Sequence, residues 1–452
     1  MSHHDSKTFD SIIVGAGFAG LMAARALFRA GQKILVLEAR DRVGGRIHTQ
    51  WLDDRTYVDL GGQWIGPTQD EMYRLLAEYE LSYFPTYEKG RSLTYLDEKL
   101  TSYQGLIPPL PVPALLNLDF ALKRMNRLSA KVDLENPWAT KQALKWDEQS
   151  LHQWMKRNIK FSKARRFFKI AIEAIYASNP QELSLLHTLF YCKSGGNLDQ
   201  LLNMQNGAQQ DRIYGGAQTI AERMADEFRD YLQLSTPVDQ VHQTAEEVIV
   251  HSQSKAWRAK KLIICIPPVL IKNIRFSPEL PTEHTDFLAE YEMGSVIKCY
   301  AIYERPFWRE ANLNGLLSSD GGYISVCFDN SPRDGEKGML MAFVLADQAK
   351  AFAQLSEDKR KYIILDELSL FFGSEAQKPI HYLDKIWADE LYSGGCYAGM
   401  LRPGAWTQHQ QQLRRPIGRI HWAGTETATI WNGYMEGAVR SGLRAAKEVL
   451  GS

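Results

Sequence analysis

The feature that most constrains the fold lies at the N-terminus, where a β-rich run, a glycine-rich turn and an Ala- and Leu-rich segment follow one another. Residues 11–14 (SIIV) predict a buried strand, and residues 21–30 predict a helix that stops at Gly31. Residues 33–37 (KILVL) predict a second buried strand. A strand, a helix and a strand within about thirty residues form one βαβ unit. The chain therefore begins as an α/β fold.

The turn between the first strand and the helix has glycine at three positions, Gly15, Gly17 and Gly20. Gly15 permits the tight turn, Gly17 lets a pyrophosphate approach the helix N-terminus, and Gly20 allows close packing of helix on strand. Glu38 ends the second strand, where a carboxylate can accept hydrogen bonds from a ribose diol. The alternative is a glycine-rich turn with a surface Glu, which this strand–turn–helix context disfavours. The pattern predicts a bound dinucleotide.

A Gly-Gly doublet flanked by arginines follows the predicted βαβ unit. It consists of Arg40, Arg42, Gly44, Gly45 and Arg46. Paired glycines expose backbone N–H groups, and arginines make bidentate contacts with phosphate. A nicotinamide site has no need of this second phosphate loop, so the segment favours FAD.

From this segment onward the chain resembles the flavin amine oxidase superfamily, through LEARDRVGGRIHT and DLGGQWIGPTQ. The last third is similar to the monoamine oxidases in particular. The motifs that carry this similarity are GSVIKC followed by PFW, YSGGCY, and WAGTETA followed by WNGYMEGA. The resemblance extends from about Phe9 to Leu450. It implies an α/β (mixed α+β) fold in which a Rossmann-like FAD-binding domain is intertwined with a substrate domain of mixed sheet and helices.

The resemblance also implies site residues, position by position. Cys396 matches the cysteine that bonds covalently to the flavin 8α-methyl group. Tyr397 and Tyr434 match an aromatic cage that faces the flavin, and Lys298 matches a lysine held by water to flavin N5. These last three are the implied catalytic residues. The implied cofactor-binding residues are Gly15, Gly17, Gly20, Glu38, Arg40, Gly45, Arg46, Val238, Trp387, Cys396, Gly424, Thr425, Glu426 and Met435. The implied substrate-binding residues are Trp64, Leu202, Gln209, Val326 and Phe343.

The chemistry of amine oxidation explains why such residues are needed. The amine loses hydride equivalents from its α-carbon to flavin N5, and only the neutral amine has the lone pair that stabilises the developing iminium. Two phenol rings can orient the amine by their π-faces, whereas a carboxylate would favour the ammonium. Singly, each tyrosine is equally well explained as a packing residue, and a lone lysine in a strand is usually solvated. The motifs favour the functional interpretation.

Two positions depart from the family pattern and leave the substrate range open. Trp64 stands where the mammalian enzymes have Tyr, and Val326 occupies a gate position that is larger in those enzymes. A polyamine oxidase and an L-amino-acid oxidase of the same superfamily remain alternatives, and the latter would need an arginine for the carboxylate. A non-catalytic binding protein on the same fold, as in the GDP-dissociation inhibitors, is the alternative from another class.

Charge and cysteine content limit the partners. Lys plus Arg and Asp plus Glu both number 53, so nothing global attracts nucleic acid or an anionic membrane. The five cysteines form no CxxC motif, which predicts no metal site and a reducing compartment. With no apolar signal segment and no C-terminal membrane helix, we expect a cytoplasmic protein without a membrane anchor. The expected partners are a small-molecule amine and oxygen, and a homodimer is left open.

Three further segments give local predictions. Residues 296–303 (VIKCYAIY) predict a strand. Residues 105–115 contain four prolines and predict an irregular boundary region. The cationic run over 156–169 alternates with phenylalanines and predicts an amphipathic helical segment with a solvated basic face.

We expect two intertwined domains. The FAD-binding domain is predicted to comprise residues 1–84, 212–289 and 388–452, and the substrate-binding domain residues 85–211 and 290–387. The active site is predicted between them, as is common for pockets at domain interfaces.

Overall fold

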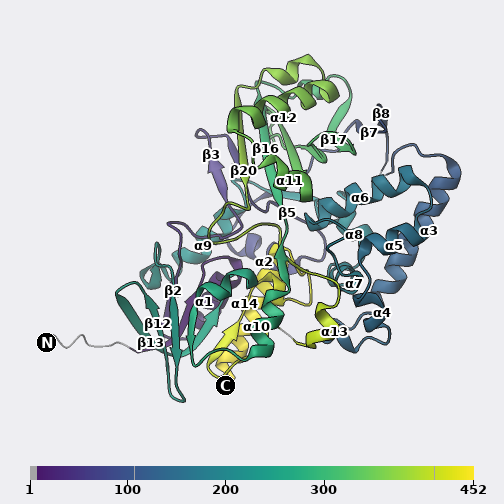
Figure 1. The fold of residues 1–452 in the computed structure, drawn as a ribbon. Helices are drawn as coiled ribbons and strands as arrows, with labels where there is room; N and C mark the ends of the chain where they lie inside the picture. The colour runs from purple at the N-terminus through teal and green to yellow at the C-terminus, as the bar shows by residue number, and fades with distance from the viewer. Residues whose placement is uncertain (1–7, 106, 412, 452) are drawn as a thin grey trace.

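The computed structural model describes residues 8–105, 107–411 and 413–451 (Figure 1). One large sheet holds the N-terminal βαβ unit, with strand order β10-β2-β1-β13-β12-β11-β14 and β22 paired to β13. The strand bounds are β1 Phe9–Val14, β2 Ile34–Leu37, β10 Leu232–Gln233, β11 Gln240–Gln243, β12 Val248–Ser252, β13 Lys255–Ile264, β14 Arg275–Ser277 and β22 Ile420–Trp422. β1 runs parallel to both β2 and β13, and all four residues of β2 are buried. The mixed α/β class predicted from the sequence is confirmed.

The helix of the βαβ unit, α1 (Phe18–Arg29), begins three residues earlier than predicted because Gly17 is its extended N-cap. The predicted role of Gly20 in close packing is confirmed, since a Cβ on it would lie 1.8 Å from the Gly15 carbonyl oxygen. α14 (Met435–Leu450) packs against α1, as Figure 1 shows. Gly442 permits this approach, since a Cβ there would lie 2.2 Å from the Ala19 carbonyl oxygen.

A second large sheet has the order β20-β16-β19-β18-β17-β7-β8. Its bounds are β7 Arg91–Leu96, β8 Lys99–Tyr103, β16 Val296–Tyr303, β17 Leu313–Ser319, β18 Val326–Asp329, β19 Gly338–Leu345 and β20 His381–Ile386. β16 matches the predicted strand residue for residue and is buried along its whole length. Helices α11 (Ala346–Phe352) and α12 (Glu357–Phe372) lie beside this sheet (Figure 1). Lys298 is therefore a buried residue of an inner strand and not a solvated edge residue.

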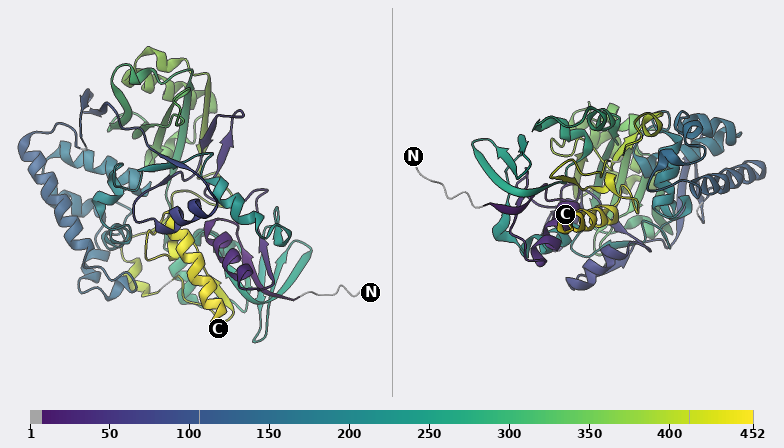
Figure 2. Two further views of the ribbon diagram at one scale, coloured as in Figure 1. Left: turned by 180° about the vertical axis from the view of Figure 1, so that it is seen from behind. Right: turned by 90° about the horizontal axis from the view of Figure 1, so that it is seen from below.

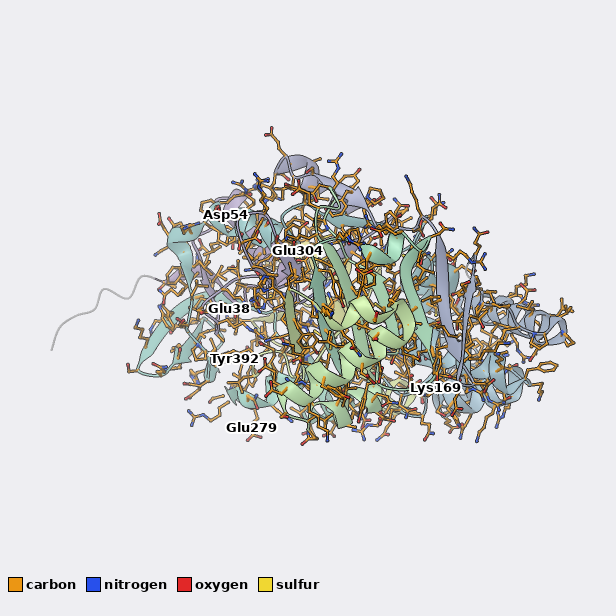
Figure 3. All side chains as sticks on the ribbon, turned by 90° about the horizontal axis from the view of Figure 1, so that it is seen from above. Glu38, Asp54, Lys169, Glu279, Glu304 and Tyr392 are labelled. Carbon is orange, nitrogen blue, oxygen red and sulfur yellow. The ribbon has the colours of Figure 1, made fainter. Side chains whose placement is uncertain are left out.

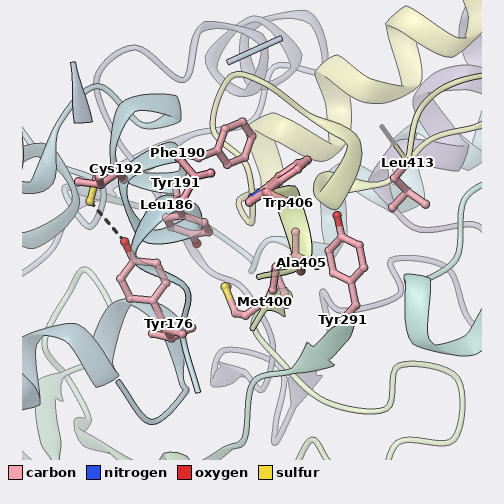
Figure 4. Packing of buried hydrophobic residues seen from close by; sticks show 14 of the residues in the cluster. Tyr176, Leu186, Phe190, Tyr191, Cys192, Tyr291, Met400, Ala405, Trp406 and Leu413 are labelled. Carbon is pink, nitrogen blue, oxygen red and sulfur yellow. Dashed lines mark hydrogen bonds between the residues drawn. The ribbon is translucent and has the colours of Figure 1, made fainter. Parts of the chain in front are cut away.

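A helical region lies to one side of the two sheets, where the two views in Figure 2 show it. Its helices are α3 Val112–Ser129, α4 Ala143–Asp147, α5 Leu151–Asn158, α6 Ser162–Tyr176, α7 Leu185–Ser194 and α8 Leu198–Leu202. The irregular region predicted at 105–115 was wrong in its last residues, because Pro113 lies in the first turn of α3, where an N–H has no intrahelical partner. The basic run over 156–169 is divided between α5 and α6. Figure 4 shows aromatic and aliphatic side chains packed in the core that α7 contributes to.

Smaller elements join the large ones. They are the sheets β3 (Thr49–Trp51) with β4 (Tyr57–Asp59), β15 (Tyr291–Met293) with β21 (Gly399–Leu401), and β5 (Trp64–Ile65) with β9 (Asp211–Ile213) and β6 (Tyr83–Pro85). The remaining helices are α2 Asp70–Glu78, α9 Gln218–Asp226, α10 Thr282–Ala289 and α13 Ala405–His409. β6 and β9 include residues 84 and 211, where two of the domain boundaries were predicted, and the division into domains stays a prediction. Within the described residues, no helix has the length and apolar character that a membrane span requires.

Candidate active site

A cavity of about 370 Å³ is lined by residues of both large sheets, the helical region and α14. Most of the site residues predicted from the sequence line it. These are Gly15, Gly17, Glu38, Arg40, Gly45, Arg46, Trp64, Gln209, Val238, Lys298, Phe343, Trp387, Cys396, Tyr397, Gly424, Thr425, Tyr434 and Met435. Four predicted residues are not part of the lining: Gly20, Leu202, Val326 and Glu426. The fold thus collects into one cavity residues from nearly the whole length of the chain.

At the nucleotide end of the cavity, the backbone has the geometry of an anion site. Gly15 has a φ of +99°, and a Cβ on it would lie 3.0 Å from the Cys265 carbonyl oxygen. A Cβ on Gly17 would meet nothing nearer than the Gly44 carbonyl oxygen at 3.9 Å. Helix α1 starts at this open space and has no side-chain cap. The N–H groups of its first turn are therefore directed toward the space and can bind an anion there. The pyrophosphate of FAD fits this cradle.

Glu38 stands beside the cradle and is 4% exposed. Its Oε2 accepts a hydrogen bond from Ala16 N at 2.6 Å, and its Oε1 accepts one from Arg40 N at 2.9 Å. Each carboxylate oxygen can accept more than one hydrogen bond, so the fixed carboxylate can also bind a ribose diol. Glu38 and Tyr392, both labelled in Figure 3, line the same cavity.

The arginines after Glu38 are engaged with carboxylates. Arg40 donates to Glu390 at 3.1 Å. Arg46 donates to both carboxylate oxygens of Glu426, at 2.6 and 3.0 Å, and to the Tyr397 carbonyl oxygen at 3.0 Å. Burial raises the pKa of the Glu426 carboxyl, but Arg46 lowers it further, so that the net pKa lies below its ordinary value. Arg46 and Glu426 therefore brace the chain at Tyr397.

The two predicted cage tyrosines approach the cavity from different elements. Tyr397 follows Cys396 in the loop before β21, and its ring lies 6.3 Å from Phe343. Tyr434 is the N-cap of α14, and its ring lies 4.9 Å from Trp431. Burial raises the pKa of both phenols above the ordinary value, so both rings are neutral. A pair of neutral rings can orient an amine without pairing with its charged form.

Tyr191 also lines the cavity, and sequence reasoning missed it. Its ring lies 5.8 Å from that of Tyr434, and a Cβ on Gly433 would lie 2.3 Å from its hydroxyl oxygen. Figure 4 shows Tyr191 beside Tyr176 in the same core. Tyr191 belongs to a helix that is almost wholly buried, so no amphipathic pattern in the sequence distinguishes it from packing residues.

Lys298 is 3% exposed and donates to three oxygen atoms. They are the Asp59 carbonyl oxygen at 2.6 Å, Gln63 Oε1 at 2.8 Å and the Gly61 carbonyl oxygen at 2.9 Å. Burial lowers the pKa of the Lys298 ammonium to about 7, and the Asp59 carboxylate opposes this effect. The Lys298 ammonium is thus held at one point of the cavity wall. Its lowered pKa means that it changes charge near neutral pH.

Cys396 is buried and free, and its backbone N–H donates to the Gly294 carbonyl oxygen at 3.0 Å. Burial raises the pKa of its thiol to about 12, although the Arg46 guanidinium opposes this. Trp387 lines the same wall, and its Nε1 donates to the Leu60 carbonyl oxygen at 2.8 Å. Both positions fit the isoalloxazine end of FAD.

The remaining wall is mainly apolar. The ring of Trp64 lies 6.1 Å from that of Phe343, and Val326 pairs with Phe343 across β18 and β19. Gln209 donates through Nε2 to the Leu201 carbonyl oxygen at 3.1 Å, whereas its buried Oε1 has no hydrogen-bond partner among the described residues. Leu202, at the end of α8, packs against the core of the helical region.

The lining contains one carboxylate side chain among the residues that the structure describes, that of Glu38. The described chain also contains no cluster of three or more His, Cys, Asp or Glu residues that could hold a metal ion. The arrangement offers a dinucleotide cradle, an aromatic cage and a buried lysine.

Comparison with known proteins gives one consistent result. A model of the flavin containing amine oxidoreductase family matches residues 18–450. A probable flavin-containing monoamine oxidase A of Dictyostelium discoideum is 36% identical over 98% of each chain. A flavin-containing amine oxidase of Oncorhynchus mykiss is 38% identical over 98% of this chain and 86% of its own.

Solved structures are similar over the whole fold. A putrescine oxidase bound to putrescine has a TM-score of 0.94 and 31% identity, over 98% of this chain and 99% of its own. A cyclohexylamine oxidase from Brevibacterium oxydans has a TM-score of 0.93 and 29% identity, over 98% of each chain.

Proposed function

The chain belongs to the flavin-containing amine oxidoreductase family, and from this premise we propose that it oxidises primary amines with apolar or aryl side chains. The enzyme is an FAD-dependent amine oxidase. The proposed overall reaction is RCH2NH2 + O2 + H2O → RCHO + NH3 + H2O2, in which hydrolysis of the imine follows oxidation. The observation that carries the substrate class is the cage of neutral phenols at the flavin end of the cavity, where the described lining has no carboxylate.

The residues at the flavin end would act by binding and positioning. FAD, when bound, supplies the acceptor for the electrons that leave the amine α-carbon. Tyr397 and Tyr434 orient the neutral amine by their π-faces, and the surrounding apolar wall excludes water. Because burial keeps both phenols protonated, neither is available as a base for the substrate.

The same lining argues against the two related oxidase activities. A diamine or polyamine carries a second ammonium group, which needs a buried carboxylate partner, and the one carboxylate of the described lining lies at the nucleotide end. An amino acid needs a free arginine, but Arg40 and Arg46 are already paired with Glu390 and Glu426. We therefore do not propose putrescine as the substrate of this enzyme, although the putrescine oxidase has the same fold.

A panel of amines tests the proposal. Anaerobic bleaching of the bound flavin and formation of peroxide would be measured with a primary arylalkylamine, a diamine of similar length and an L-amino acid. We expect bleaching with the arylalkylamine at the lowest concentration. Faster bleaching with the diamine or the amino acid would replace the proposed substrate class by that of the better substrate, and no bleaching with any amine would refute the function.

We also propose that the flavin is bound covalently to Cys396 Sγ. The support is the buried free thiol in the wall beside Trp387 and Lys298, within the motif that resembles the monoamine oxidases. Acid precipitation of the wild type should leave yellow colour in the pellet, and Cys396→Ala should release it. Release of free FAD from the wild type would reject the covalent bond without affecting the FAD assignment. A cytoplasmic location stays a prediction from the sequence.

A further inference from the structure

The three hydrogen-bond acceptors of Lys298 are of two kinds, backbone and side chain. Two of its three acceptors, the carbonyl oxygens of Asp59 and Gly61, belong to the backbone, and the third is the side-chain oxygen of Gln63. An ammonium has three N–H donors and no acceptor, so these three oxygens satisfy its charged form completely. Gln63 supplies the side-chain acceptor of this set, so a substitution at Gln63 can remove that acceptor.

The orientation of the Gln63 amide is itself fixed. Its Nε2 donates to Asn330 Oδ1 at 2.7 Å, and its Oε1 accepts from Lys298 at 2.8 Å. The Tyr300 hydroxyl lies 3.1 Å from this Oε1 and 2.7 Å from the Asp59 carbonyl oxygen, and it can donate its one proton to either. Gln63 is 1% exposed and Asn330 is fully buried, so water does not offer either amide an alternative partner. A reversed amide would place an NH2 group against the ammonium and leave the Asn330 oxygen without a donor.

We propose that Gln63 is a positioning residue for Lys298: its oxygen completes the acceptor set that holds Nζ at one point in charged form, and Asn330 fixes which end of the Gln63 amide faces the lysine. Its effect on catalysis rests on the proposed function, whereas its effect on Lys298 does not.

The charged groups around Lys298 shift its pKa in opposite directions, so one neutral hydrogen-bond acceptor can decide its charge. Burial lowers the pKa of Lys298 to about 7, Asp59 raises it, Arg212 lowers it and Cys396 raises it. On the neighbouring strand β20, Lys385 lies opposite Lys298 and is paired with Glu390. Because the midpoint falls near neutral pH, gain or loss of one hydrogen bond to the ammonium decides its charge there.

The acceptor set also bears on how Lys298 can bind a further group. Its three N–H groups are bound to protein oxygens, so a water that bridges Lys298 to the flavin, as the family resemblance implies, would share an N–H with one of these acceptors or displace it.

A direct titration of Lys298 tests this inference. The holoenzyme would be labelled with [ε-13C]lysine, and the Lys298 signal would be assigned by its loss in Lys298→Met. Its chemical shift would be followed with pH in the wild type, Gln63→Leu, Gln63→Glu and Asn330→Leu. Gln63→Leu should lower the midpoint by about one to two pH units, because it removes a hydrogen bond to the charged form. Gln63→Glu should raise the midpoint, and Asn330→Leu should lower it by less than Gln63→Leu.

Gln69→Leu is the matched control, because Gln69 is also a fully buried glutamine of this segment, and its amide has no hydrogen-bond partner among the described residues. Its Lys298 midpoint should equal that of the wild type. Equal midpoints in the wild type and Gln63→Leu would overturn the inference. If Gln63→Leu fails to fold, an unchanged midpoint in Gln63→Glu overturns it equally.

A second measurement separates this inference from the proposed function. The rate of reaction of the reduced enzyme with oxygen would be measured against pH, and its fall at high pH should move to lower pH in Gln63→Leu. A shifted Lys298 midpoint in a protein that bleaches with no amine would reject the proposed function and leave the role of Gln63 intact. An unshifted midpoint in an active amine oxidase would do the reverse.

Discussion

The two ends of the cavity are built in different ways. At the nucleotide end, the cradle and the carboxylate proposed to bind the ribose come from one stretch of 24 residues, Gly15 to Glu38, and most of the geometry of this stretch is backbone geometry. At the flavin end, Lys298, Tyr397 and Tyr434 come from β16, a loop and the start of α14, and side-chain hydrogen bonds and ring contacts hold them.

This difference predicts different responses to substitution. A change at the nucleotide end acts on the βαβ unit itself or on access of the pyrophosphate to the helix N-terminus. A change at the flavin end can leave the fold and the bound FAD intact and still misplace the reacting groups, since an error of about 1 Å can reduce the rate roughly a hundredfold. The following five experiments separate these cases.

The largest effect is expected from Gly20→Ala. The added Cβ would lie 1.8 Å from the Gly15 carbonyl oxygen, so α1 has to move away from β1 and we expect little folded protein. Gly17→Ala is its matched control, because the added Cβ meets no atom within 3.9 Å. Gly17→Ala should fold normally and lose FAD, since the methyl group occupies the cradle. Thermal denaturation and flavin content measure the two effects, and a folded Gly20→Ala protein with full flavin would contradict the comparison.

The next effect concerns the Arg46–Glu426 pair, which braces Tyr397. Glu426→Gln leaves the part-buried Arg46 guanidinium, whose side chain is 19% exposed, without its carboxylate, and should destabilise the fold by about 3 kcal/mol, the lower end of the cost of breaking a buried pair. The double variant Arg46→Met with Glu426→Leu removes both charges and should recover much of that loss. Denaturant unfolding measures both. Equal destabilisation by the single and double variants would show that the unpaired charge of Arg46 is not the cause of the lost free energy of unfolding.

The same pair makes a pH prediction. The folded pKa of Glu426 lies below its ordinary value, so the pair contributes its full stability above the unfolded pKa of about 4.3. That contribution is lost as the pH falls through the lowered folded pKa. The Tm of Glu426→Gln should therefore fall less steeply on acidification than that of the wild type, and parallel curves would contradict this.

At the flavin end, ring removal should be separable from folding. Tyr397→Ser and Tyr434→Ser should lower kcat/KM roughly a hundredfold while flavin content stays normal. Tyr397→Phe and Tyr434→Phe keep the ring and should lose little, because burial keeps both phenols protonated and neither is available as a base. Anaerobic flavin bleaching by an arylalkylamine is the measurement. Equal loss in the Phe and Ser variants would mean that the hydroxyl takes part in the chemistry.

The smallest effect is expected for Glu38→Ala. Loss of the carboxylate removes hydrogen bonds to the ribose and should weaken FAD binding by about 1.5–3 kcal/mol. If a covalent bond forms at Cys396, the effect appears as slower incorporation of FAD into apoprotein. Time courses of incorporation for Glu38→Ala and the wild type measure it, and identical courses would argue against the ribose contact.

The N-terminal unit and the buried strand β16 were predictable because their signals are local. A strand that is buried on both faces is a mainly apolar run, and the φ of +99° at Gly15 is a requirement of the local turn, which glycine meets without strain. The start of α3 was missed because proline suits both an irregular segment and the first turn of a helix.

The sequence by itself determined the βαβ unit, the residues available for FAD and the membership of a flavin amine oxidase family. Only the tertiary structure decided that Arg46 braces Tyr397, that Tyr191 lies against Tyr434, and that Gln63 completes the acceptors of Lys298. The physical reason is the range of the interactions. A backbone turn is set by residues a few positions apart, whereas a buried ion or ring takes its partners from whatever distant segments the packed core brings within hydrogen-bond distance.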